Sequence, residues 1–186
     1  MTTYQQALEH CTSDSDRAVV TRNIGGVYRR QGNNAQALQL YQQALELDPR
    51  NGWAHTNIGL IYAVQGAWEP ARAAFRQATT LDPNNGSFHA SLANACYHLG
   101  DREAGDHHLA LARPLMERKD EYDHACFAAI AGNRRAALDL LRVALEKAPG
   151  QMEWAQRDPD FAALRADAEF RALVGLDPPS ATPGAG

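Results

Sequence analysis

Apolar and small residues recur at helical spacing along most of the chain, in stretches of about 14 residues that end alternately at glycine and at proline. The glycines that end every other stretch are separated by 34, 34 and 32 residues: Gly32, Gly66, Gly100 and Gly132. Glycine tolerates the left-handed conformation that commonly ends a helix, and proline cannot continue one. Each period therefore predicts a helix, a turn, a second helix and a stop.

The first two periods match position by position with a shift of 34 residues. Ile24, Gly25, Tyr28, Ala37, Tyr41, Ala44 and Pro49 recur as Ile58, Gly59, Tyr62, Ala71, Phe75, Ala78 and Pro83. The small residues at these positions predict a close approach of the two helices of each period, and the aromatic residues fill the space beside them.

This spacing resembles the tetratricopeptide repeat, in which small and aromatic positions on two helices are followed by proline. The tryptophan of that signature is replaced here by Thr21, His55 and His89, so the resemblance rests on the other positions. It covers nearly the whole chain. The resemblance implies an all-α fold, a right-handed α-solenoid of antiparallel helix pairs with about four repeats and a capping helix or helices at each end.

The third period departs from the pattern. Cys96 replaces the aromatic residue, Gly105 replaces an alanine at a cost of about 1 kcal/mol, and Pro114 should end or kink the second helix about one turn early. Near the other end of the chain, Phe161, Leu164, Phe170 and Leu173 are predicted to close the core. The expected boundaries are an N-terminal half-repeat or capping helix over residues 1–16, repeats over 17–51, 52–85, 86–117 and 118–150, C-terminal capping helices over 151–175 and a disordered tail over 176–186.

Composition narrows the class of partner. A formal net charge of -4 supplies no basic field for nucleic acid, and no apolar run is long enough to predict membrane insertion. The first residues lack the pattern of a signal peptide, and Cys11, Cys96 and Cys126 fit free thiols, so we expect a cytoplasmic protein. Arginine greatly outnumbers lysine, as in bacterial proteins encoded by GC-rich genomes.

The resemblance also implies that the first helices of successive repeats line a concave groove that binds a protein or peptide. Helical spacing independently places these positions on one stripe. From one end to the other the stripe is basic, then apolar and aromatic, then polar, which would suit a segment with an acidic group. The candidate residues are Arg22, Asn23, Arg29, Arg30, Trp53, Thr56, Asn57, Leu60, Val64, Asn94, Tyr97 and His98.

Three alternatives remain open for this groove. The arginines can be no more than a solvated face, and the asparagines can be structural. A clamp for the C-terminal carboxylate of a chaperone matches at Arg22 and Asn57, but Gly26, Ser87 and Ser91 stand where that clamp needs an asparagine and two basic residues.

Two other classes of function compete with an adaptor. The truncated first repeat favours a self-associating assembly factor that uses the ends of the solenoid. A metal or redox role would rest on His89, Cys96, His98, His107, His108, His124 and Cys126. No Cys-x-x-Cys pair or catalytic motif occurs in the sequence. We therefore expect no metal, no cofactor and no enzymatic activity. We expect a binding protein that is a monomer or a weak oligomer.

Overall fold

The computed structural model describes residues 11–116 and 119–176, which form helices and connecting turns with no β-strand among them. The chain divides into two compact units, the first ending at Leu115 and the second beginning at Met116. The expected half-repeat lies mostly outside the described residues, and so does nearly all of the expected disordered tail.

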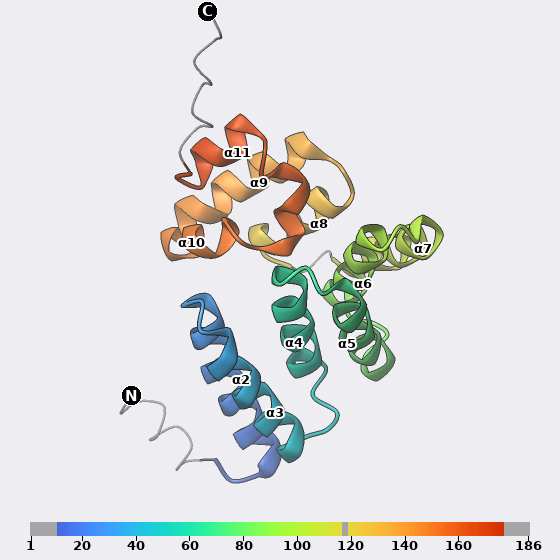
Figure 1. The fold of residues 1–186 in the computed structure, drawn as a ribbon, viewed down its shortest axis with the longest axis vertical. Helices are drawn as coiled ribbons and strands as arrows, with labels where there is room; N and C mark the ends of the chain where they lie inside the picture. Colours follow the sequence, from blue (N-terminus) through green and yellow to red (C-terminus); the bar gives the residue numbers. More distant parts are fainter. Residues whose placement is uncertain (1–10, 117–118, 177–186) are drawn as a thin grey trace, which may run out of the picture. The chain divides into compact units, whose positions relative to one another are not determined.

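The first unit consists of three helix pairs stacked in sequence order (Figure 1). Within each pair the two helices pack along their length, and the second helix of each pair also contacts the first helix of the next. The predicted all-α fold, a right-handed solenoid of antiparallel helix pairs, is confirmed. The elements are α2 (Asp14–Arg30), α3 (Asn34–Leu47), α4 (Gly52–Val64), α5 (Trp68–Leu81), α6 (Gly86–His98) and α7 (Arg102–Ala112), followed by the short helix η1 (Arg113–Leu115).

Local sequence explains where these helices begin and end. Each one except α5 begins after a Ser, Asn or Asp whose side chain accepts a hydrogen bond from a backbone N–H of the first turn. The turns between paired helices contain the predicted glycines in the left-handed conformation, with φ of 80° at Gly32 and 74° at Gly66. A side chain is strained at such an angle, so glycine fixes the position of each turn.

Aromatic rings on the second helices hold the first two pairs together. The ring of Tyr41 lies so close to Gly25 that a Cβ there would be 2.7 Å from the ring atom Cε1, and Phe75 approaches Gly59 in the same way at 2.5 Å. Tyr41 is completely buried. The predicted close approach at these glycines is confirmed.

The third pair has a glycine and aromatic contact at other repeat positions. The ring of Tyr97 on α6 occupies the space where a Cβ of Gly105 on α7 would stand, so here the aromatic residue lies on the first helix and the glycine on the second. Gly105, which was expected only to destabilise the helix, provides the space that this ring occupies. The predicted early end is confirmed, because α7 has 11 residues against 14 in α3 and stops two residues before Pro114.

The second unit contains one long helix pair and a set of short helices. Phe161 and Phe170 from the short helices are completely buried against residues of the long pair such as Leu138 and Leu141, and Leu164 joins the same core. Leu173 packs against this core, so the predicted closure is confirmed. The elements are α8 (Glu121–Ile130), α9 (Arg134–Lys147), η2 (Pro149–Gln151), α10 (Met152–Ala155), η3 (Pro159–Leu164) and α11 (Ala168–Leu173).

Neighbouring glycines in α2 provide a test of this packing. Gly25→Ala should lower the free energy of unfolding by about 1–3 kcal/mol, because the added methyl meets the ring of Tyr41. Gly26→Ala is the matched control, since its Cβ would be 3.8 Å from the nearest atom and alanine favours helix by about 1 kcal/mol. Denaturant unfolding should show opposite signs for the two variants, and equal effects would contradict the proposed contact.

Candidate functional site

A hollow of about 380 Å³ lies on the first unit between α2 and α4. Four of its lining residues follow one stripe of α2, and Gly26 lies between them as a gap in the stripe, while α4 supplies the opposite wall. Six of the twelve candidate residues meet here, and the full lining is Arg22, Asn23, Gly26, Arg29, Arg30, Trp53 and Asn57.

The hollow is strongly basic, because the described residues that line it include three arginines and no acidic residue. Burial raises the pKa of the Tyr41 hydroxyl, and the charges of Arg29, Arg30 and Arg22 oppose that rise. Burial also lowers the pKa of Arg22. Partly desolvated guanidinium groups in one place favour a carboxylate or another anion.

Polar and aromatic neighbours fix the direction of the side chains. The Nη2 of Arg22 donates a hydrogen bond to Oδ1 of Asn23 at 2.9 Å. Trp53 remains 39% exposed, although its ring meets Phe88 edge to face with the centroids 4.8 Å apart. Because Phe88 is buried, it holds the indole as a fixed wall of the hollow.

Four of the other candidate residues are buried or half-buried and do not line the hollow. Thr56 is buried, and its Oγ1 donates to the carbonyl of Gly52 at 3.0 Å. Leu60 packs against the core between the second and third pairs, and Asn94 is buried. Val64 is half-buried at the end of α4 and does not line the hollow.

Tyr97 and His98 are also engaged within the first unit. The hydroxyl of Tyr97 donates to Oδ1 of Asp106 at 2.8 Å, and burial, followed by this hydrogen bond, raises the pKa of Tyr97 to about 12. The imidazole of His98 stacks on Trp68, with ring centroids 3.7 Å apart and planes 4° from parallel. Neither side chain joins the hollow between α2 and α4.

A second hollow, of about 270 Å³, shares Arg22 and Trp53 with the first. Its lining includes Val19, which was not among the candidate residues. The repeat register contained the signal, because Val19 and Trp53 are 34 residues apart and occupy the same position in their repeats. The other new lining residues come from the turns and from later helices, which the stripe could not indicate.

Three histidines meet between α6 and α7, apart from both hollows. Nδ1 of His89 lies 3.1 Å from Nδ1 of His108, and Nε2 of His89 lies 2.9 Å from the carbonyl oxygen of Pro83. Because a carbonyl only accepts, Nε2 of His89 carries a hydrogen, and the neutral ring accepts from His108 at Nδ1. The pair can hold one added proton without losing this hydrogen bond, but a second proton would leave two donors facing each other.

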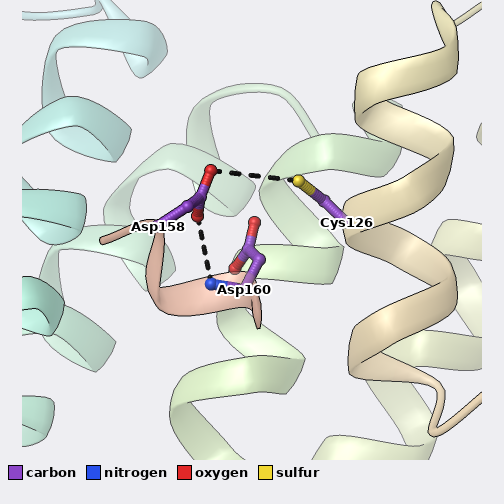
Figure 2. A group of neighbouring side chains, drawn as sticks. All are labelled: Cys126, Asp158 and Asp160. Carbon is purple, nitrogen blue, oxygen red and sulfur yellow. Dashed lines mark hydrogen bonds between the residues drawn. The ribbon is translucent and has the colours of Figure 1, made fainter. Parts of the chain in front are cut away.

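The histidines and cysteines on which a metal or redox role would rest are not gathered at one possible metal site among the described residues. In the described part of the chain, the one group of three or more possible metal ligands is Cys126, Asp158 and Asp160, whose ligand atoms lie within 4.8 Å of one another, and it contains no histidine (Figure 2). Cys96 is buried in a separate core.

The side chains of Cys126, Asp158 and Asp160 are better suited to stabilising the fold through hydrogen bonds than to binding a metal. Asp158 is buried, and its Oδ2 atom accepts a hydrogen bond from the Tyr122 hydroxyl at 2.9 Å. The same oxygen faces the Cys126 sulfur at 4.0 Å, and Oδ1 accepts a hydrogen bond from the backbone N–H of Asp160 at 3.0 Å (Figure 2). Burial, and then the charges of Asp158 and Asp160, raise the pKa of Cys126 well above its usual value. A thiol must lose its proton to bind a metal, so this donor set favours hydrogen bonding between α8 and η3.

Comparison with protein families identifies the repeats. Residues 25–66 match a family model described as "TPR repeat", and residues 52–85 match one described as "Tetratricopeptide repeat". No curated protein matches the chain.

Solved structures share the fold. The chain is similar to YrrB, described as "a TPR protein with an unusual peptide-binding site", with 21% identity over 92% of this chain and 86% of that one and a TM-score of 0.54. Pseudomonas aeruginosa pilF has 20% identity over 81% and 68% of the two chains, with a TM-score of 0.53. The O-GlcNAc transferase of Thermobaculum terrenum (K341M mutant) has 22% identity over 74% of this chain and a TM-score of 0.57, but the chain spans only 27% of that enzyme.

None of the helices within residues 11–116 and 119–176 is both long enough and apolar enough to cross a bilayer.

The histidine pair leads to a pH-dependent prediction. Burial, followed by the nearby rings of His89 and His107 and the charge of Arg76, lowers the pKa of His108. The unfolded chain then binds this proton more readily, so stability is complete above the unfolded pKa of about 6.5 and declines as the pH falls from there toward the lower folded pKa. His108→Gln should make unfolding less sensitive to acid over this window.

Thermal or urea unfolding between about pH 8 and pH 5 measures this effect. His107→Gln is the comparison variant and should reduce the acid sensitivity less than His108→Gln does. His107 is exposed, makes no hydrogen bond to His89 among the described contacts and lowers the pKa of His108 through its charge. A steeper loss of stability in acid for His108→Gln than for the unchanged protein would contradict the assignment.

Proposed function

The chain is a tetratricopeptide-repeat protein, and from that premise we propose that it is a scaffold whose hollow between α2 and α4 binds an acidic segment of a partner protein. The observation that carries the proposal is the gathering of Arg22, Arg29 and Arg30 in one hollow. Guanidinium groups form paired hydrogen bonds with carboxylates and are enriched at protein interfaces.

The shape of the site supports a peptide segment as the ligand. The hollow is open along the first helices of two successive pairs, and Trp53 offers a large aromatic surface that is still 39% exposed. Aromatic and arginine side chains are the residues that most often dominate binding energy at interfaces. The peptide-binding site named in the description of YrrB, which has the same fold, agrees with this use of the repeats.

We propose that the hollow binds without catalysing a reaction. Its lining is arginine, asparagine, glycine and tryptophan, and none of these side chains exchanges a proton near neutral pH. The cysteines are free thiols, which fits the reducing conditions of the cytoplasm, where we place the scaffold.

A display selection with random 12-residue peptides tests the proposal. Peptides retained by the protein should be enriched in Asp and Glu, and the best of them should bind Arg22→Glu about tenfold more weakly or worse, because the variant places a carboxylate beside the ligand. Arg102→Glu makes the same change of charge on the exposed start of α7 and should leave affinity unchanged.

The comparison requires that all three proteins unfold at similar temperatures. If the selection yields no enrichment in acidic residues, or if Arg22→Glu and Arg102→Glu bind the peptides equally well, the hollow is not the binding site.

A further inference from the structure

Two hollows on the first unit meet at the same two side chains, Arg22 and Trp53. The second hollow lies where α3 and α5 end and where α4 and α6 begin, as its lining shows. A ligand that enters the first hollow therefore has the second within immediate reach across the indole of Trp53.

The two hollows differ in charge. Of the residues in the described part of the chain that line the first hollow, three are arginines and none is acidic. In the second, Arg22 and Arg50 are balanced by Asp48 and Asp82, so it has no net charge to attract an ion.

The two carboxylates of the second hollow already take part in turns. Oδ1 of Asp48 accepts the backbone N–H of Arg50 at 3.0 Å, and Oδ1 of Asp82 accepts that of Asn84 at 3.1 Å. Both aspartates therefore stabilise the turns that follow α3 and α5, and the net charge of the residues lining the second hollow remains zero.

The second hollow is instead suited to an apolar side chain. Val19, Trp53, Leu81 and Phe88 form its apolar walls. Val19 is 40% exposed and Trp53 39%, and they are two of the few large apolar side chains that the described part of the chain leaves so open to solvent. Covering them with an apolar group removes apolar surface from water on both partners.

We propose that the partner segment carries an acidic residue and a large apolar residue with one residue between them, so that the carboxylate enters the first hollow and the apolar side chain the second. In an extended segment such residues point to the same side, about 7 Å apart, which allows them to lie on either side of one aromatic ring. This inference rests on the proposed function and specifies the chemistry of the partner at that same site.

Blocked eight-residue peptides on a glycine and serine background provide the test. The probes contain Glu-Ser-Leu, Glu-Ser-Ala, Gln-Ser-Leu, or Glu and Leu separated by five residues. Binding is followed through the indole N–H signal of Trp53 in NMR spectra, which Trp53→Phe identifies. Glu-Ser-Leu should bind about tenfold more tightly than Glu-Ser-Ala, because only leucine fills the second hollow.

Paired valine variants show where the apolar side chain binds. Val19→Ser should remove the advantage of Glu-Ser-Leu over Glu-Ser-Ala and leave the affinity for Glu-Ser-Ala unchanged. Val143→Ser is the matched control, because Val143 is equally exposed, at 39%, on α9 of the second unit. It should leave both affinities as they are.

The outcomes separate the two proposals. Equal binding of Glu-Ser-Leu and Glu-Ser-Ala, equal binding of the widely spaced peptide, or an undiminished leucine advantage in Val19→Ser overturns this inference and leaves the acidic site standing. If Gln-Ser-Leu binds as well as Glu-Ser-Leu, or if no peptide with Glu shifts the Trp53 signal, both proposals fall.

Discussion

The contact of the Tyr41 ring with Gly25 is the constraint on which the rest of the first unit depends. The ring fills the space between α2 and α3 and is completely buried, so it sets how closely the two helices approach. Its hydroxyl lies within about 4 Å of where a Cβ of Gly26 would stand, at the edge of the basic hollow. One side chain thus joins the helix interface to the arginines, and Phe75, its counterpart in the next repeat, has no oxygen to do the same.

The sequence predicted the architecture because each feature of the repeat has a local cause. The left-handed glycines mark the turns, and Gly25 and Gly59 mark the helix contacts. Half of the candidate groove residues meet in the hollow because they share the first-helix stripe of two successive repeats. Tyr97 does not line the hollow because its ring packs against Gly105 on the opposite helix. This contact depends on how the two helices pack, which the sequence pattern does not reveal.

Polar groups outside the hollows have mostly internal partners, which a list of residue types could not reveal. The histidines and cysteines are concentrated in the third and fourth repeats of the sequence, but His89 bonds to His108 and Pro83, whereas Cys126 faces Asp158 in the other unit. Their spacing along the chain contained no information about these partners. The basic hollow differs in composition, because it brings three arginines of one helix together.

The contact of Tyr97 with Gly105 shows that a helix pair needs a protrusion and a recess of matching shape, whichever helix carries each. In the first two pairs the recess is a glycine of the first helix, and in the third pair it is a glycine of the second helix. The repeat positions of Gly59 and Phe75 hold Ala93 and Leu109 in the third pair. An alanine at Gly105, which the corresponding positions Ala37 and Ala71 accept in the first two repeats, would therefore meet an aromatic ring in this pair.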